Sequence, residues 1–237
     1  MQRQLFEQSF LIRKSKIHLK SDSEKAIFEA IKDIKNCLKE IMSYIKIHPE
    51  FQHTLRPINV LPEAPELIRY MADSALKAGV GPMASVAGAI ADFGMKTMLR
   101  SNAKTAIVED GGEIAVTTNK HVIVGLLSSY PSLSGKIGFY ITKEDSPLGI
   151  ATSSSKTERV LSFGEADSVT IVADNASLAD AAATAVCNVV AGTDICKSIR
   201  QGLDRAKEIS GVRGVIIIRE GQIGLWGRLP RIVNIKE

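Results

Sequence analysis

The stretch from Asp167 to Val186 reads DSVTIVADNASLADAAATAV. Its first part, residues 168–174, is apolar at successive positions, which is typical of a strand buried on both faces of a sheet. The Ala-rich sequence that follows predicts a helix from Ser177 to Val190, and a serine at the start of a helix favours the N-cap position. The stretch therefore predicts a central strand followed directly by a helix.

Strand and helix patterns outside this stretch occur in separate blocks. Residues 5–19 predict two short strands, and a capping box at Ser21–Glu24 predicts the start of a long amphipathic helix that ends near His48. Further strands are predicted at residues 104–110, 113–118, 121–127, 137–142, 148–153, 212–220 and 222–227, with another helix at 195–209. Because strands and helices do not alternate strictly, we expect an α+β fold with a mainly antiparallel sheet packed against helices.

The composition excludes several classes of protein. The chain has 237 residues, 45% of them hydrophobic, and a net charge of +4 without a cluster of Lys and Arg, so we expect no nucleic-acid binding. Its apolar stretches are too short for a signal peptide or a membrane span, and its three cysteines have no disulfide or metal spacing. We therefore expect a cytoplasmic protein with no membrane contact. Its length predicts a single domain over residues 1–237, or two tightly packed lobes of about 1–103 and 104–237.

Small residues dominate the segment VGPMAS at residues 80–85. Pro82 suits the first turn of a helix, and backbone amides at a helix start bind anions. Gly81, Pro82 and Ser85 are therefore candidates for contact with a phosphate. The same composition also fits a close crossing of two helices, for which Gly81 and Gly88 must be small, and composition alone favours this packing explanation.

Acidic residues flank a Gly-Gly turn in the sequence EDGGEI at residues 109–114. Two glycines suit the tight turn of a hairpin, and free amides at such a turn bind phosphate. For this motif alone, a plain hairpin with solvated acids is the simpler explanation.

Asp180 and Thr184 are four residues apart on the predicted helix after the central strand. They therefore share one helix face, where a carboxylate and a hydroxyl offer two oxygen ligands to Mg²⁺. Two local explanations are equally consistent with the sequence. Asp180 could cap its own helix in a box with Ser177, and the Thr184 hydroxyl could bond the carbonyl four residues back.

Taken in order, these three segments resemble the ApbE-like superfamily. Its best-known members are flavin transferases that bind FAD and use Mg²⁺ to move FMN onto a threonine of a target protein. Those enzymes carry a VGP helix start, a Gly-Gly hairpin and a late SVTV…ADAxxTA block, which match residues 80–85, 110–114 and 168–185 of this chain. The similarity runs from about Gly79 to Val190, and the chain looks closer still to a small branch found in methanogenic archaea and some bacteria.

The resemblance implies an ApbE-like fold and a site for FAD or FMN with Mg²⁺. Asp180 and Thr184 match the positions that bind the metal in the transferases, and the VGP segment would line the same cleft. Residues 150–155 read IATSSS, where the transferases have a TSG turn that contacts the cofactor. The further nucleotide contacts implied in this way are Gly111, Gly112, Glu113, Thr152, Ser153 and Ser154.

One segment departs from the transferases. They follow the TSG turn with a histidine and an Asp-Pro that help to hold FAD, whereas residues 157–167 here read TERVLSFGEAD. A general base must reach the proton that it removes, and the sequence identifies no catalytic residue in this loop. We therefore expect a protein that binds a flavin or another phosphate-bearing small molecule with Mg²⁺, and the sequence leaves open whether it is an FMN-transferase-like enzyme. The alternative is a non-catalytic structural or assembly protein with the same fold. The sequence leaves open whether the chain forms a homo-oligomer.

Overall fold

The computed structural model describes residues 4–12, 15–126, 134–155 and 164–235. Its strands are β1 (Phe6–Ile12), β2 (Ser15–Ser21), β3 (Ala106–Asp110), β4 (Glu113–Thr117), β5 (Val122–Gly125), β6 (Ile137–Ile141), β7 (Leu148–Ser153), β8 (Ser168–Ala173), β9 (Val212–Arg219), β10 (Gln222–Gly227) and β11 (Arg231–Asn234). Its helices are α1 (Glu24–Ile47), α2 (Glu50–His53), α3 (Glu66–Ala78), the 3-10 turn η1 (Pro82–Ser85), α4 (Val86–Arg100), α5 (Ala176–Val189) and α6 (Ile195–Glu208).

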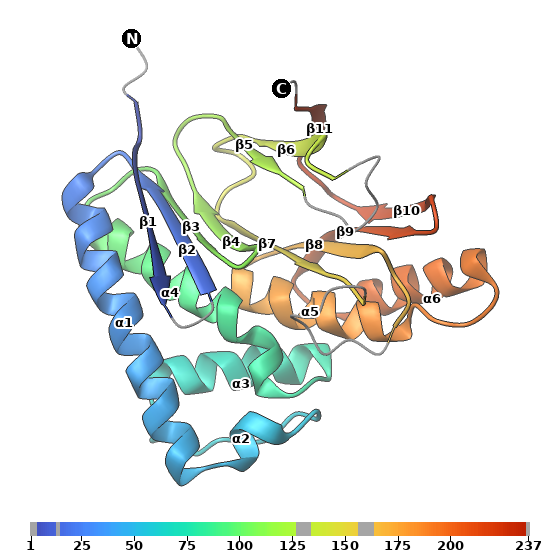
Figure 1. Cartoon of the computed structure of the whole chain (residues 1–237), viewed down its shortest axis with the longest axis horizontal. Coiled ribbons are helices and arrows are strands. Elements are labelled where there is room, and N and C mark those ends of the chain that lie inside the picture. The colour runs from blue at the N-terminus through green and yellow to red at the C-terminus, as the bar shows by residue number, and fades with distance from the viewer. Residues whose placement is uncertain (1–3, 13–14, 127–133, 156–163, 236–237) are drawn as a thin grey trace.

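Two antiparallel sheets organise the fold (Figure 1). The larger sheet has the strand order β1-β2-β3-β4-β7-β8-β9-β10, and the smaller has the order β11-β6-β5. All strand pairs among the described residues are antiparallel. The predicted α+β class with a mainly antiparallel sheet is confirmed.

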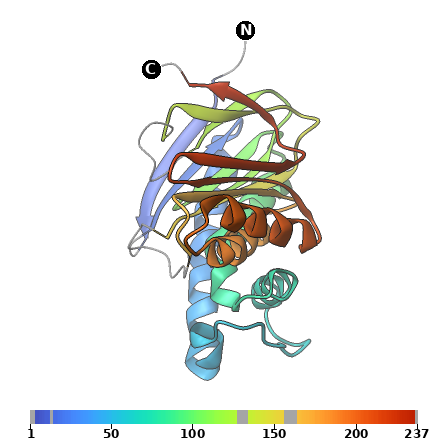
Figure 2. The ribbon, with the colours of Figure 1, turned by 90° about the vertical axis from the view of Figure 1, so that its right-hand side faces the viewer.

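The two sheets and the helices form three layers, which Figure 2 shows from the side. Helices cover one face of the large sheet, and two adjoining apolar clusters fill the space between them. The small sheet packs on the other face over a third apolar cluster, which includes Phe139 and Ile150. Among the described helices, none combines the length and apolar composition that a membrane crossing needs.

The stretch that begins at Asp167 forms a central strand and a helix, as predicted. Strand β8 lies between β7 and β9, and all six of its residues are buried. The predicted helix cap, however, is wrong by two residues: Asn175 caps α5 by accepting the N–H of Leu178 at 2.8 Å. Ser177 instead donates its hydroxyl to Ser74 inside the protein, so its tertiary partner outweighs its capping preference.

Two other expectations near the helices are corrected. The first helix is capped by Ser23, which accepts the N–H of Ala26, and not by Ser21. Ser21 is buried and instead accepts the N–H of Ser23, two residues on, at 3.2 Å. Strand β11 was not predicted, because a four-residue strand next to Pro230 carries too short an alternating pattern.

Helices α4 and α5 cross closely at their N-terminal ends. A Cβ atom on Gly88 would lie 2.1 Å from the carbonyl oxygen of Ala176, and one on Gly149 of β7 would lie 2.1 Å from the Ala176 amide nitrogen. Ala176 is therefore held between two glycines from neighbouring elements. This contact supports the packing explanation for the small residues that follow the VGP motif.

At this crossing, each helix also places a carboxylate against the first turn of the other. Asp92 of α4 accepts the N–H groups of Ala176 and Ser177 at 3.0 and 2.9 Å, in the first turn of α5. Asp180 of α5 accepts the N–H of Gly88 at 3.0 Å, in the first turn of α4. Each helix thus satisfies a free amide of the other, and a carboxylate at a helix start is stabilised by the helix dipole.

Gly88→Ala is expected to lower the free energy of unfolding by about 2–3 kcal/mol, because its Cβ would collide with backbone atoms that cannot move alone. Urea denaturation measures the change. Gly94→Ala on the same helix is the matched control: its Cβ would meet the Cδ1 of Ile34, a movable side-chain end, and alanine favours the helix. Equal stability of the two variants would contradict the close crossing.

Candidate functional site

Strand register places the acids of the Gly-Gly hairpin on the face of the large sheet that the helices cover. Asp110 of β3 and Glu113 of β4 are directly paired across the hairpin. Side chains alternate along a strand, so Asp110 shares a face with Val108 and Glu113 shares a face with Ala115. Both apolar residues belong to the core beneath the helices. The two carboxylates therefore point toward the helix layer.

Helix α5 presents one partly exposed stripe near these acids. Its residues from Ala176 to Val186 are buried except Asp180 and Thr184, and Asn188 continues the same stripe. The spacing of four residues places all three on one face. The predicted metal pair thus consists of half-buried residues on one face of an otherwise buried helix.

The carboxylates of Asp180, Glu113 and Asp110 interact electrostatically. Burial raises the pKa of Asp180 to about 8, and nearby Asp110 raises it further against the hydrogen bond from Gly88. Burial raises the pKa of Glu113 well above its usual range, and Asp180 and then Asp110 add to this effect. Residues from β3, β4 and α5 therefore form one acidic site, in which a cation would relieve the repulsion between like charges.

The donor set suits Mg²⁺ only with help from a ligand. No group of three or more His, Cys, Asp or Glu side chains is arranged to hold a metal ion within the part of the chain that the structure describes. Mg²⁺ commonly takes one or two carboxylates and completes its shell with phosphate and water. Asp180 and Thr184 would fit such a site, with a phosphate-bearing ligand supplying the remaining oxygens.

Sequence comparison identifies the family. A family model described as "AbpE bacteria" matches residues 11–224. The chain belongs to the ApbE-like family.

Curated relatives of this ApbE-like protein cover almost its full length. A UPF0280 protein of Methanocaldococcus jannaschii is 39% identical over 233 residues, which are 97% of this chain and 93% of the relative. A UPF0280 protein of Methanopyrus kandleri is 37% identical over 235 residues, which are 98% and 95% of the two chains. The chain therefore lies in the small archaeal branch that its motifs resemble.

Solved structures share the ApbE-like fold. The apo form of the Pseudomonas stutzeri flavinyl transferase ApbE has a TM-score of 0.59 at 13% identity and covers 94% of each chain. The ApbE protein from Thermotoga maritima has a TM-score of 0.57 at 16% identity, covering 94% of this chain and 97% of its own. At such low identity these matches show the fold alone.

In this ApbE-like protein the VGP segment is packed inside the fold. A Cβ on Gly81 would lie 1.9 Å from the carbonyl oxygen of Thr54, and Pro82 is buried. The buried Ser85 hydroxyl donates to the carbonyl oxygens of Met71 and Pro82 at 3.1 and 2.8 Å. These contacts are structural, and the segment reaches the acidic site through the Gly88 amide that follows it.

The other residues that the resemblance suggests as nucleotide contacts do not all lie on the same face of the large sheet. Gly111 and Gly112 form the hairpin turn, with positive φ values of 70° and 122°. Ser153 shares the helix-covered face with Ala151, and its buried hydroxyl oxygen has no hydrogen-bond partner among the described residues. Thr152 points to the opposite face, where its hydroxyl lies 2.9 Å from that of Thr170. Ser154 is buried beyond the strand end.

The local explanation for Asp180 is incorrect, because α5 is capped by Asn175 and the Asp180 carboxylate reaches α4 instead. Residues 157–167 form the segment that departs from the transferases, and its part up to residue 163 lies outside the described residues. Its described end joins a buried polar network.

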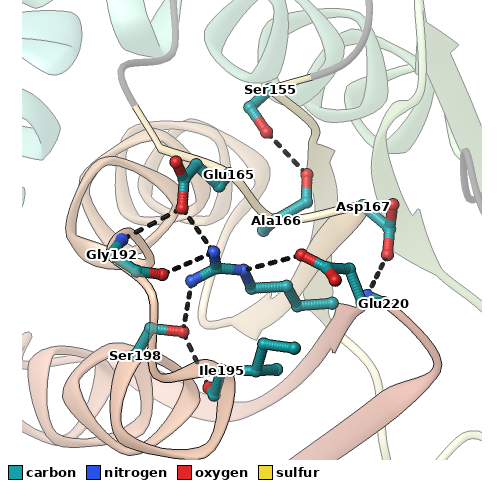
Figure 3. A network of polar contacts seen from close by, with 9 residues as sticks. Ser155, Glu165, Ala166, Asp167, Gly192, Ile195, Ser198 and Glu220 are labelled. Carbon is teal, nitrogen blue, oxygen red and sulfur yellow. Dashed lines mark hydrogen bonds and ion pairs between the residues drawn. The ribbon is translucent and has the colours of Figure 1, made fainter.

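Arg219 of β9 centres this network, and sequence reasoning missed it (Figure 3). Its side chain is 4% exposed and donates to the Ser198 hydroxyl and the Gly192 carbonyl oxygen, both at 2.7 Å. It also donates to Glu165, and Asp167 accepts the N–H of Glu220 beside it. The network fastens residues 164–167 to α6 and to the loop after α5. An arginine next to an apolar run was the only sequence signal.

Asp110 is the second residue that sequence reasoning did not single out. It is 3% exposed, and burial raises its pKa to about 6, while a hydrogen bond from the Ser15 hydroxyl opposes this shift. Alternation along β3 places it inward, but the adjacent Gly-Gly turn suggested solvent exposure. Its burial makes the folded state sensitive to pH.

Asp110→Asn is expected to stabilise the protein at pH 7 and not at pH 4. The folded-state pKa of about 6 exceeds the ordinary value of 3.8, so the stability contributed by the proton is present near pH 4 and lost as pH rises through 6. The difference between the two values corresponds to about 3 kcal/mol. Urea denaturation of both proteins at pH 4, 5, 6 and 7 measures it. A difference between variant and wild type that does not change with pH would contradict the burial of this charge.

Proposed function

We propose that this ApbE-like protein binds a flavin nucleotide, or another phosphate-bearing small molecule, together with Mg²⁺. The observation that carries the proposal is the stripe of α5, where Asp180 and Thr184 are half-buried on one face of an otherwise buried helix. The Asp180 carboxylate is largely removed from water and meets backbone amides and other acids, so its charge is only partly compensated. A cation with a bound phosphate would complete that compensation.

Two further features support the proposal. Burial, and then the neighbouring acids, raise the pKa values of Asp180 and Glu113, and a divalent cation would offset the cost of ionising these carboxyl groups. Solved neighbours of the same fold are described as flavin transferases. Family membership supports only the fold. The reason to expect a ligand here is the local chemistry of α5 and the hairpin.

Mg²⁺ bound at this site would neutralise phosphate charge and hold the phosphates in one orientation. Asp180 and Thr184 would supply its protein oxygens, and the Gly88 amide would hold the Asp180 carboxylate in place. Glu113 would face the ligand from the hairpin. FMN-transferase-like catalysis is the extension of this proposal: the hydroxyl oxygen of a target protein would bond to the FMN phosphorus of bound FAD, the pyrophosphate P–O bond would break, AMP would leave, and the hydroxyl proton would pass to solvent.

The second candidate function is that of a structural or assembly protein that keeps the fold without catalysis. One observation favours it: the Asp180 carboxylate already has a structural task, since it accepts the Gly88 amide and ties α5 to α4. In that case Asp180 serves packing, and no metal response is expected.

Titration of the purified protein with FAD and with FMN, each with and without Mg²⁺, separates the candidates. We expect flavin fluorescence to report binding that is weak or absent without Mg²⁺ and strong with it. Absence of binding at high micromolar ligand in both conditions would remove flavins from the proposal. A parallel thermal-shift assay with inorganic pyrophosphate and Mg²⁺ then tests other phosphate compounds, and no response there favours the structural candidate.

A further inference from the structure

Two aspartates occupy equivalent positions at the crossing of α4 and α5. Asp92 lies four residues, about one turn, after Gly88, and Asp180 lies four residues after Ala176. Asp92 accepts the N–H of Ala176, and Asp180 accepts the N–H of Gly88, both at 3.0 Å. The two contacts are therefore reciprocal, and each carboxylate binds the helix start that precedes the other.

The surroundings of these two carboxylates differ. Asp92 is 1% exposed, and its Oδ2 also accepts the Ser177 N–H at 2.9 Å and the Tyr70 hydroxyl at 3.0 Å. Protein donors thus occupy both of its oxygens. Asp180 is half-buried, and other acids lie near it. Asp92 therefore has the surroundings of a structural contact, whereas Asp180 has those of a group that can bind a ligand.

Asp92 fixes the rotation of α5 about the helix axis. Each of its oxygens holds one of two successive amides, those of Ala176 and Ser177, so the first turn cannot rotate without breaking a bond. The Ser177 hydroxyl adds a bond to Ser74 of α3 at 2.8 Å. Because successive helix residues keep a fixed angular spacing, a rotation at the start of α5 would turn its whole stripe relative to the acidic hairpin.

Backbone contact transmits any displacement of α5 to the amide that holds Asp180. A Cβ on Gly88 would lie 2.1 Å from the carbonyl oxygen of Ala176, so the two backbones touch at this point. If the first turn of α5 moved, the Gly88 amide would either follow it or lose the Asp180 carboxylate. The contact made by Asp92 is thereby coupled to the contact made by Asp180.

We propose that Asp92 is a positioning residue for the metal pair, because its bonds to the first turn of α5 hold Asp180 and Thr184 toward the acidic hairpin. The part of this inference that concerns Mg²⁺ rests on the proposed function, whereas the coupling of Asp92 to Asp180 needs no ligand. Asp92 does not itself enter the ligand shell, since the protein already supplies its donors.

Asp92→Asn tests the proposal, because it keeps the side-chain shape and replaces one acceptor with an NH₂ group that faces donors. We expect Mg²⁺-dependent binding of FMN to weaken about tenfold, as it does when residues that orient metal ligands are lost. Flavin fluorescence measures this at a temperature where every variant is folded. In the metal-free protein, the Gly88 amide proton should move upfield in the NMR spectrum as its bond to Asp180 lengthens.

Met98→Ala is the matched control for stability. Met98 is fully buried near the other end of α4, so alanine leaves a cavity and destabilises the protein without touching the crossing. We expect wild-type binding of FMN and an unchanged Gly88 resonance in this variant.

Tyr70→Phe is a milder variant that is used if Asp92→Asn does not fold. It removes one of the three donors to Asp92 and keeps the carboxylate charge. We expect Mg²⁺-dependent binding of FMN to weaken about threefold, with a smaller upfield shift of the Gly88 proton, since a single hydrogen bond is lost. Absence of both changes in Tyr70→Phe would overturn the proposal.

Three results with Asp92→Asn would also overturn it. Unchanged Mg²⁺-dependent affinity would show that Asp92 does not position the metal pair. Weaker affinity with an unchanged Gly88 resonance would assign the effect to the lost charge. Equal effects in Met98→Ala would show that the site follows overall stability. Failure of the proposed function differs from all three: wild type would show no Mg²⁺-dependent binding, and the Gly88 resonance would still shift in Asp92→Asn.

Discussion

Asp180→Asn is expected to weaken Mg²⁺-dependent binding of FMN by about a hundredfold, with no loss of stability in the metal-free protein. The substitution removes the one carboxylate of the proposed metal pair. The asparagine side-chain oxygen can still accept the Gly88 amide, so the tie between α5 and α4 remains. Because burial holds the Asp180 pKa near 8, a neutral side chain at this position is tolerated at pH 7.

The measurement is a thermal-shift assay with increasing Mg²⁺, with and without FMN. Thr184→Val is the companion variant, because it keeps the side-chain shape and removes the second oxygen ligand. Asp204→Asn is the matched control: Asp204 is an exposed acid on α6 that pairs with Lys207. An equal response to Mg²⁺ in all four proteins would show that the α5 stripe is not the metal site.

Arg219→Leu is expected to lower the free energy of unfolding by about 3 kcal/mol. The guanidinium group is buried and joins three segments, and its loss leaves the Gly192 carbonyl oxygen without this donor. Glu165 is about half exposed and can turn to water, which limits the cost on its side. The expected loss therefore comes mainly from buried hydrogen bonds and packing, and urea denaturation measures it.

Arg213→Leu is the matched control on the same strand. Arg213 also pairs with an acid, Asp174, at 2.7 Å, but both side chains are partly exposed. Exposed ion pairs contribute about 0–1 kcal/mol, so this variant should unfold close to wild type. If both arginine variants lose the same stability, the buried network does not have the special role described above.

Sequence patterns predicted most strands and the long helices because apolar residues recur at regular spacing along them. Strand β7 and strand β10 have the predicted bounds, and α5 follows β8 directly. Helix caps were less predictable: Ser177 and Ser21 both suit an N-cap, but Ser177 bonds to Ser74 far away in the sequence, and Ser21 accepts the N–H of Ser23 just before the helix begins. Capping preference is worth about 1 kcal/mol, which one tertiary contact can offset.

The candidate site was predictable only where its residues lie on one element. Asp180 and Thr184 are four residues apart, and helix geometry alone places them together. Asp110 and Arg219 form hydrogen bonds with residues far away in the sequence, such as Ser15 and Ser198. No local pattern carries that information, since burial of a charged side chain is decided by the packing of several elements.

The hydrogen bond from Gly88 to Asp180 joins residues 92 positions apart. Contacts between such distant residues form late in folding, because closing the intervening chain costs entropy before the contact can reward it. A chain emerging from the ribosome holds α4 and the hairpin well before α5 is made, so the acidic site is completed among the last parts of the molecule. During folding, protection of the Gly88 amide from hydrogen–deuterium exchange would then report that α4 and α5 have come into contact.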